Sequence, residues 1–281
     1  MKILFTNIHQ QTTWINDDEN YSLIAISGLQ PPKATIQLGS LPGVDGSMHL
    51  HSKVEQRTIN LTLQILGDGE SNRRKLAQIF KIKQMGTLRL ELSNQKVRID
   101  AIVESVEVLP MSWPMRALIT LICPQPYFED EQSIQLELAS IDQLFQFPLS
   151  LNQEGQAIGN LSPSTAINAY NSGDMDIGFK IRFQCIAPIE NPKLIHLTTG
   201  EYIQLMTSMN AGQVIEIQTE IGQKRIEQVN SNERINLFHT LKLGSTFFQL
   251  REKDNILFAT CDVGASWLMT EIIYRVKTSG V

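Results

Sequence analysis

The sequence predicts a mainly β protein with one helix, built from two β domains. Asn, Gln, Ser and Thr are frequent and only 19% of the residues are charged, a composition that suits sheets better than helices. Apolar and polar residues alternate in many short segments, which is the period of a strand. Turn residues separate these segments along most of the 281-residue chain. We therefore expect a bent, split-barrel-like sheet in the first half and an antiparallel sandwich in the second.

The chain opens with three short strand-like segments. We expect strands at residues 2–5, 23–26 and 34–38, with a polar connecting segment at residues 12–20.

Residues 41–65 contain the most informative pattern of the first half. Two turn dipeptides, Pro42-Gly43 and Asp45-Gly46, stand directly before one long alternating segment. Its apolar residues occupy even positions before residue 55 and odd positions after residue 58. Both sets can face one core only if a bulge or bend lies within residues 55–58, as in the wall of a barrel or split barrel.

One helix follows this strand. Ser71 is the expected N-cap, Leu76, Ile79 and Phe80 form an apolar stripe, and Gly86 is the expected stop. The outer face carries five basic residues: Arg73, Arg74, Lys75, Lys81 and Lys83. They form either a basic binding patch or a solvated helix face, and the net charge of −5 favours the solvated face.

Further strands and a domain boundary follow the helix. Strands are expected at residues 88–92, 97–101 and 118–123, with a loop at Pro110–Pro114 that contains Trp113. Two prolines and three acidic residues at 124–131 break any regular element. We therefore predict a first domain at residues 1–135 and a second at 136–281.

The second half is predicted to form short strands separated by turns. This pattern is typical of an antiparallel sandwich. The expected strands lie at residues 177–185, 195–197, 203–205, 214–217, 246–250, 256–260 and 268–276.

Composition excludes several classes of function. The small negative net charge argues against tight nucleic-acid binding. The N-terminal residues lack the pattern of a signal peptide and no apolar run reaches membrane-spanning length, so we expect folding in the cytoplasm and no membrane insertion. The three cysteines, Cys123, Cys185 and Cys261, are expected to be buried small hydrophobic residues.

No catalytic or cofactor-binding motif stands out. His49 and His51 have a spacing that a metal could use, and Asp174 and Asp176 could hold a hard cation, but neither pair has a further ligand nearby. No nucleophile motif is present and no carboxylate pair is singled out. We expect no enzyme activity, no metal and no cofactor.

Several short motifs follow one another in a fixed order along the chain. In the first half they are the turn residues Pro42, Gly43, Asp45 and Gly46, then Arg57 with Ile59–Leu63, Arg73-Arg74, and Cys123 with Tyr127-Phe128. In the second half they are Asn171-Ser172-Gly173, Asn191-Pro192, Gly212–Thr219, Asn236 and Leu243–Phe248. In this order the motifs resemble the distal tail protein family of long-tailed siphophages. The chain departs from the family pattern at Val44, where a basic residue is frequent, and at Asp254, where a glycine is frequent.

The resemblance implies an architectural function in the virion tail tip, after assembly in the host cytoplasm. Split-barrel domains would close a hexameric ring around a channel through which DNA passes, and galectin-like β-sandwich domains would point outward. Implied partners are further copies of the chain, the major tail tube protein and the tail-associated hub protein. A receptor-binding protein or side fibre is a further partner that the outer domain would hold.

Two predictions concern particular residues. The strand after the double turn is expected to contact a neighbouring subunit through Met48, His49, Leu50, His51, Ser52 and Lys53. The alternative function is a carbohydrate-binding adhesin module, for which Trp267 in the second half is the candidate for sugar stacking. A glycan hydrolase is the third hypothesis.

Overall fold

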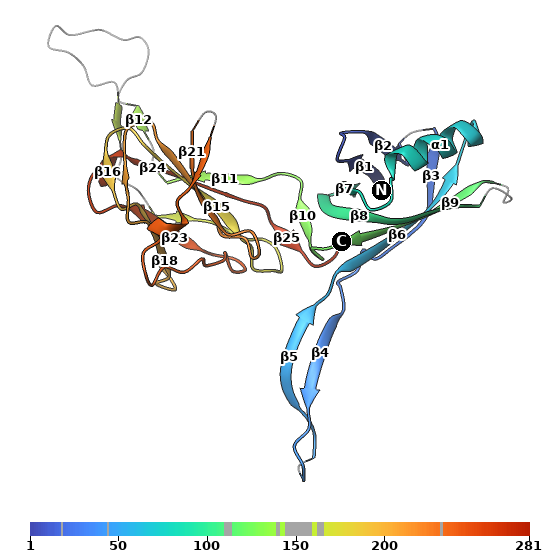
Figure 1. Cartoon of the computed structure of the whole chain (residues 1–281), viewed down its shortest axis with the longest axis horizontal. Helices are drawn as coiled ribbons and strands as arrows, with labels where there is room; N and C mark the ends of the chain where they lie inside the picture. Colours follow the sequence, from blue (N-terminus) through green and yellow to red (C-terminus); the bar gives the residue numbers. More distant parts are fainter. Residues whose placement is uncertain are drawn as a thin grey trace, which may run out of the picture. The chain divides into compact units, whose positions relative to one another are not determined.

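The computed structural model describes residues 1–17, 19–43, 45–109, 114–138, 141–143, 159–161, 166–230 and 233–281. In this part of the chain the fold is mainly β with one α-helix, which confirms the predicted fold class (Figure 1). The chain divides into two compact units. Unit 1 holds Met1–Glu131 together with Lys277–Val281, and unit 2 holds Gln132–Val276. The last residues of the chain therefore return to unit 1, and the ranges 1–135 and 136–281 remain a prediction about functional domains.

Unit 1 is built on one nine-stranded antiparallel sheet. Its strands are β1 Lys2–Asn7, β2 Thr12–Ile15, β3 Tyr21–Ser27, β6 Arg57–Ile65, β7 Met85–Glu91, β8 Lys96–Leu109, β9 Arg116–Cys123, β10 Phe128–Asp130 and β25 Lys277–Thr278. The path runs β2-β1-β7-β8-β9-β6-β3, and β10 pairs with both β8 and β25. The outer strands of the path, β2 and β3, meet where the Asn16 N–H donates to the Tyr21 carbonyl at 3.1 Å. The described strands do not close into a barrel, and the split-barrel description remains a prediction.

Strand β2 was not expected from the sequence. The segment at 12–20 is polar overall, but Thr13 and Ile15 are buried and all four residues of β2 pair with β1. A short edge strand whose two apolar residues, Trp14 and Ile15, are adjacent shows no alternation.

The core of unit 1 forms where alternate residues of the long strands meet the helix. Strand β6 shows the pattern most clearly, because Ile59, Leu61 and Leu63 are fully buried while the residues between them face outward. The helix adds Leu76 and Phe80 to the same core. Alternation with period two therefore places one face of each strand in a single apolar cluster.

Helix α1 spans Gly69–Ile79, and its ends differ from the prediction. Asp68, not Ser71, is the N-cap, because the Asp68 side chain accepts from the Ser71 N–H at 3.5 Å. The helix ends before Phe80, not at Gly86. Phe80 leaves the helix because its ring stacks on Phe5, with 4.2 Å between the ring centroids.

Gly86 lies in strand β7 for a steric reason. A Cβ at this position would lie 2.4 Å from the ring of Phe5, so only glycine lets β7 approach β1 there.

Unit 2 contains two larger sheets that share one core. The six-stranded sheet has the order β11 Ile134–Glu137, β24 Leu268–Tyr274, β15 Phe179–Cys185, β20 Val214–Gln218, β21 Arg225–Val229 and β22 Arg234–Asn236. The four-stranded sheet has the order β14 Ile167–Asn168, β23 Ile256–Thr260, β17 Lys193–His196 and β18 Tyr202–Gln204. Buried residues of both sheets belong to one cluster, so unit 2 is an antiparallel sandwich. The finer galectin-like description remains a prediction.

Smaller elements complete unit 2. They are the pairs β12 Ile141–Gln143 with β13 Gly159–Leu161 and β16 Ile189–Glu190 with β19 Ser208–Met209, and the 3₁₀ turns η1 Phe238–Thr240 and η2 Ala265–Trp267.

Two features of unit 2 differ from the sequence analysis. Residues 246–250 form no strand, although Phe248 and Leu250 are buried, and only Leu250 makes a single bridge, to Ile177. Strands β21 and β22 were not expected, because their charged residues hide the alternation. Apolar spacing identifies which residues are buried more reliably than whether a ladder forms.

Two sequence features lie outside the described residues: Pro110–Trp113 of the expected loop, and Val44 between the two turns. Among the described residues, no helix has the length and apolar character needed to cross a membrane.

Candidate functional site

A two-stranded hairpin in unit 1 is the main candidate surface. Strands β4 Ala34–Gly39 and β5 Met48–Val54 pair with each other and with no other described strand. In Figure 1 the hairpin extends away from β3 and β6, the strands that flank it in the sequence. Every residue of β5 and every residue of β4 before Gly39 is exposed. None of these side chains contributes to the core of its own unit.

The double turn forms the tip of this hairpin. Gly43 and Gly46 have φ values of 79° and 98°, a region that favours glycine. Pro42 and Asp45 are exposed, and a Cβ on either glycine would meet nothing within 4 Å. The glycines are therefore required by backbone conformation and not by a close neighbour.

The change of parity along the chain is explained by a strand break. Strand β5 ends at Val54 and β6 begins at Arg57, so the chain breaks at the predicted position. The even set, Met48, Leu50 and Val54, is exposed, so the two sets do not face one core. A second irregularity lies inside the hairpin, where Gln37 pairs with His51 and Leu38 with His49. Leu50 is thus skipped in the register, and its side chain approaches within 3.0 Å of the position that a Cβ of Gly39 would occupy.

The hairpin exposes an unusual amount of apolar surface. Ile36, Leu38, Leu41, Met48 and Leu50 have exposed fractions of 60, 58, 55, 53 and 56%. A two-stranded hairpin is at best marginally stable alone in water, and contiguous exposed apolar surface marks an interaction site. The geometry suits a surface that becomes covered by another chain.

The candidate metal pairs gain no further ligand. His49 and His51 are both exposed on β5, and Asp174 and Asp176 are exposed in a loop that precedes β15. Across the described residues there is no group of three or more His, Cys, Asp and Glu side chains placed to hold a metal ion.

Of the five basic residues expected on the outer face of the helix, Arg73, Arg74 and Lys75 lie on α1, whereas Lys81 and Lys83 follow its end at Ile79. Arg73 pairs with Glu70 at 3.0 Å, and Arg74, Lys75, Lys81 and Lys83 are exposed to solvent. Exposed ion pairs of this kind contribute little to stability.

Trp267 lies in η2, at one end of strand β24. Its side chain is 42% exposed, and Ile186 and Val263, which hydrogen bonds place in the same group of turns, are 50% and 53% exposed. Trp267 is therefore accessible, but apolar residues surround it.

The cysteines are buried and unpaired, as expected. Burial raises the pKa of Cys123 to about 12 and raises the pKa of Cys185. Burial also raises the pKa of Cys261. A thiol with a raised pKa is a poor nucleophile, so these residues are structural.

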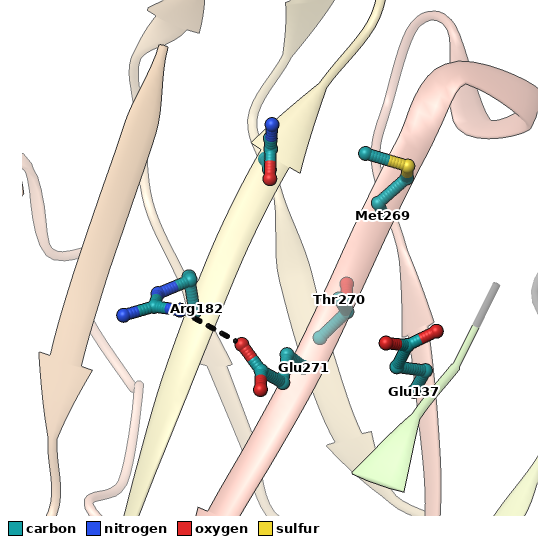
Figure 2. Close-up of a pocket in the computed structure, with 6 residues that line it drawn as sticks. Glu137, Arg182, Met269, Thr270 and Glu271 are labelled. Carbon is teal, nitrogen blue, oxygen red and sulfur yellow. Dashed lines mark hydrogen bonds and ion pairs between the residues drawn. The ribbon is translucent and has the colours of Figure 1, made fainter. Parts of the chain in front are cut away.

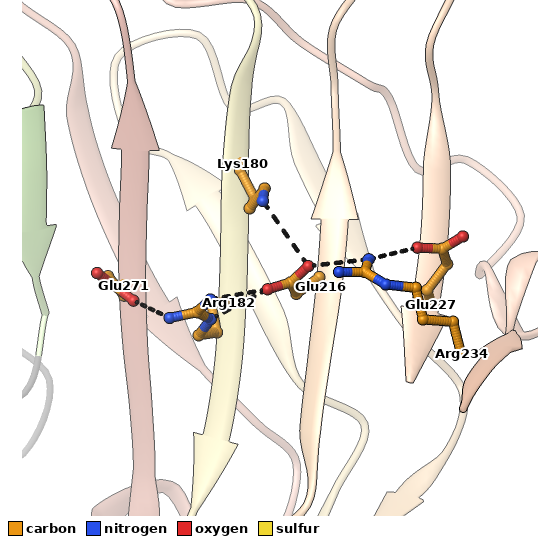
Figure 3. Close-up of polar contacts among 6 residues, drawn as sticks. All are labelled: Lys180, Arg182, Glu216, Glu227, Arg234 and Glu271. Carbon is orange, nitrogen blue, oxygen red and sulfur yellow. Dashed lines mark hydrogen bonds and ion pairs between the residues drawn. The ribbon is translucent and has the colours of Figure 1, made fainter. Parts of the chain in front are cut away.

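The outer face of the six-stranded sheet carries a row of charged side chains (Figure 3). In register across four strands lie Glu271 of β24, Arg182 of β15, Glu216 of β20 and Glu227 of β21. Arg182 bridges two of the carboxylates, at 3.0 Å from Glu271 and 2.8 Å from Glu216. Arg234 bridges Glu216 and Glu227, at 3.4 and 2.9 Å.

Glu216 is the centre of this row. Its side chain is only 8% exposed, and Lys180 adds a third cation at 3.7 Å. Burial alone would raise the pKa of Glu216, but the hydrogen bond from Arg182 and the charges of Lys180, Arg182 and Arg234 outweigh it and lower the pKa. Glu216 is therefore a stably ionised carboxylate.

A shallow pocket of about 160 Å³ opens beside this row (Figure 2). Its lining comes from β11, β15 and β24: Glu137, Arg182, Gln184, Met269, Thr270 and Glu271. Glu137 and Glu271 are cross-strand neighbours on one sheet. A glycosidase instead places its two carboxylates on opposite sides of a sugar bond, so the pocket does not have that geometry.

Sequence reasoning did not single out the charged row or the burial of Arg57. The sequence does contain a pattern that indicates this row: Lys180, Arg182 and Glu216 each stand between buried apolar residues on their strands. Which of these charges meet depends on strand order, which alternation does not reveal.

Comparison with known proteins gives one sequence match, to part of the chain. Residues 172–277 match the family described as siphovirus-type tail component, C-terminal domain. A search of curated protein sequences gave no match.

Three solved structures share the fold over nearly the whole chain. The Dit protein (gp 19.1) of phage SPP1, described as a paradigm of the hub adsorption apparatus in phages that infect Gram-positive bacteria, is 12% identical, with a TM-score of 0.67 and coverage of 98% of each chain. Chains in two structures of the phage p2 baseplate in its activated conformation, with Ca and with Sr, are 14% and 11% identical, with TM-scores of 0.57 and 0.54. Each covers 100% of this chain and 99% of that chain.

The structural likeness by itself shows the fold, and the family match is a sequence match to much of unit 2. The resemblance seen in the motifs is thus confirmed: residues 172–277 match the C-terminal domain of siphovirus-type tail components, and the chain has the fold of the SPP1 Dit protein.

Proposed function

We propose that the chain is a structural distal tail protein whose unit 1 closes a ring at the tail tip of a siphophage or prophage. The observation that carries this proposal is the exposed hairpin β4–β5, with apolar side chains such as Ile36, Leu38 and Leu50 facing solvent. A second copy of the chain is the proposed occupant. A head-to-tail contact of this kind generates a ring when the rotation closes, and six copies follow the family resemblance.

The hairpin suits this task for energetic reasons. Each large apolar side chain that becomes covered contributes roughly 1.5–3 kcal/mol. Because these side chains are already exposed in the single chain, covering them requires no unfolding of unit 1. The segment Met48–Lys53 is therefore proposed to lie against a neighbouring subunit, together with Ile36 and Leu38.

The proposed partners and location follow from the same function. The ring would join the tail tube protein to the tail-associated hub protein in the virion tail, with DNA passing through it. The charged outer sheet of unit 2 supports a polar docking surface for a receptor-binding protein or side fibre. Nothing in the described site favours catalysis, so we propose a structural protein and no enzyme.

Paired substitutions test ring closure. Leu38→Asp combined with Leu50→Asp is expected to abolish the ring, because two carboxylates would have to be buried at the contact. Ile82→Asp is the matched control, since Ile82 is 58% exposed on unit 1 but lies outside the hairpin. Native mass measurement and negative-stain images are recorded for purified protein and for tails assembled with the other tail proteins, because a template can drive closure.

The outcome separates the proposal from its alternatives. A ring that forms equally well with the double variant contradicts it, as does an assembled ring in which a photo-crosslinker at Ser52 reaches only its own chain. Absence of a ring in wild-type assembled tails also counts against it.

The alternative of a carbohydrate-binding adhesin rests on one observation, the 42% exposure of Trp267. It requires that the full chain binds cell-wall saccharides on a glycan array and that Trp267→Ala removes the binding. Retained binding in Ile186→Ala would show that the indole is responsible; no binding at millimolar saccharide rejects the alternative.

A further inference from the structure

The base of the hairpin is held by one buried arginine. Arg57 is the first residue of β6, three residues after β5 ends at Val54, and is 4% exposed. Residues 28–33 lead into the hairpin from the other side. Any group that joins these two segments fixes the point where the hairpin leaves the sheet.

Arg57 joins them through backbone carbonyls. Its Nη1 donates to the carbonyls of Gly28 and, at 2.8 Å, Gln30. Its Nε donates to the Pro126 carbonyl at 2.7 Å, and Nη2 donates to the Ser279 carbonyl. Four carbonyls on three separate segments therefore converge on one guanidinium, which has five donors in a planar fork.

The surroundings of this guanidinium leave little freedom. The Arg57 Cζ lies 4.5 Å from the ring centroid of Phe128, and within the described chain no carboxylate pairs with Arg57. A buried cation without a counter-ion depends on its hydrogen bonds, so each carbonyl acceptor must stay in place.

The C-terminal tail forms one wall of the arrangement. The Val281 N–H donates to the Leu29 carbonyl at 3.1 Å, and a Cβ on Gly280 would lie 2.7 Å from Cδ of Pro31. Strand β25 also pairs with β10 next to Phe128. The tail thus lies directly on the segment that enters the hairpin.

Two of the carbonyl acceptors of Arg57 lie close in sequence to the two connections between the units. Unit 1 is joined to unit 2 at residues 131–132 and again at residues 276–277. Pro126 and Ser279, two of the four acceptors, each stand a few residues from one of these connections. Arg57 therefore contacts the hairpin entry and both connecting segments at once.

We propose that Arg57 is a positioning residue. Together with Ser279–Val281 it forms what we call the lock, a set of contacts that holds hairpin β4–β5 in one direction on unit 1 before a second copy binds. This inference rests on the proposed ring function. Fixing the hairpin beforehand reduces the ordering cost of association. A change at either connecting segment would then be transmitted to the hairpin through Arg57.

The test uses the full chain with two variants. Arg57→Lys keeps the positive charge but loses the planar fork. Gly280→Ala displaces the tail from Pro31 without altering Arg57, so it remains informative if Arg57→Lys fails to fold. Arg74→Lys, on the exposed face of α1, is the control.

Two measurements report on the hairpin itself. Spin labels at Ser52→Cys and Gln78→Cys measure the distribution of distances between β5 and α1, and the native cysteines are buried and unlabelled. Hydrogen exchange is followed for residues 28–30 and 277–281. Both variants are expected to broaden the distance distribution and to speed exchange roughly tenfold, since hydrogen bonds to a charged group are lost.

The outcomes are distinguishable from those of the ring test. Unchanged distances and exchange in both variants overturn the lock, even if the wild-type protein forms rings. A broadened distribution in Gly280→Ala and in any folded Arg57→Lys supports the lock, even if no ring forms and the ring function fails.

Discussion

Two buried charged residues, Arg57 and Glu216, are compensated in different ways. Arg57 is surrounded by carbonyl dipoles, whereas Glu216 is surrounded by three cations. Desolvation lowers the pKa of Arg57, while the pKa of Glu216 is lowered because its cations outweigh its burial. Of these two groups only Glu216 titrates in the acid range, so Glu216 contributes an acid dependence of stability and Arg57 does not.

Glu216→Gln should destabilise unit 2 near neutral pH by about 2 kcal/mol, because Lys180, Arg182 and Arg234 lose the buried carboxylate that they share. The pKa of Glu216 in the folded chain lies below its ordinary value of 4.5. The stabilisation contributed by the ionised Glu216 is therefore complete above pH 4.5. It is lost as the pH falls through the lower pKa of the folded chain. Urea unfolding at a series of pH values should show a weaker acid dependence in the variant than in the wild type.

Glu252→Gln is the control for this experiment, since Glu252 is exposed. An acid dependence identical in Glu216→Gln and wild type would show that the charged row does not contribute to stability.

The elements of unit 1 differ in what they contribute to its core. Helix α1 buries Leu76, and Phe80, the residue that ends it, is also buried, whereas hairpin β4–β5 buries no side chain. An element that adds nothing to the core of its own unit is retained for another reason, and binding to a partner is the proposed one.

Replacing residues 34–54 with a short Gly-Asn linker should therefore leave the stability of unit 1 nearly unchanged. The free energy of unfolding is expected to change by less than about 1 kcal/mol, because no buried apolar area is removed. Leu76→Ala is the comparison and should cost about 3 kcal/mol, since it opens a cavity in the core. Urea unfolding measures both; a large loss on removal of the hairpin would mean that it packs on its own chain.

At the scale of the whole molecule, stability resides in two separate apolar clusters. One is formed by residues of unit 1 and the other by residues of unit 2. Each unit therefore has the core that independent unfolding requires, and a single transition is not expected.

Core truncations in the two units should act separately. Leu61→Ala is expected to lower the stability of unit 1 by about 3 kcal/mol and Phe183→Ala that of unit 2 by a similar amount. Calorimetry, with hydrogen exchange to assign each transition, should show one transition shifted and the other retained. If either substitution lowers both transitions equally, the two units unfold as one.

Local patterns predicted the strands well where alternation was strong. Ile59, Leu61 and Leu63 of β6, and Phe179, Ile181 and Phe183 of β15, were expected to share a face and are buried. The helix was predicted but its ends were not, because Asp68 and Phe80 are selected by a side-chain cap and by stacking on Phe5. Short or highly charged strands such as β2 and β22 carry too little apolar signal to be recognised.

The sequence by itself determined the mainly β fold, the double turn, the strand break before Arg57 and the family resemblance, because these depend on residue types at short spacing. Only the tertiary structure decided that the hairpin is exposed, that Arg57 collects four carbonyls and that Glu216 meets three cations. The physical reason is that strand order, register and the return of residues 277–281 to unit 1 bring together groups far apart in the chain. Turn chemistry and alternation act between near neighbours and carry no information about those distant contacts.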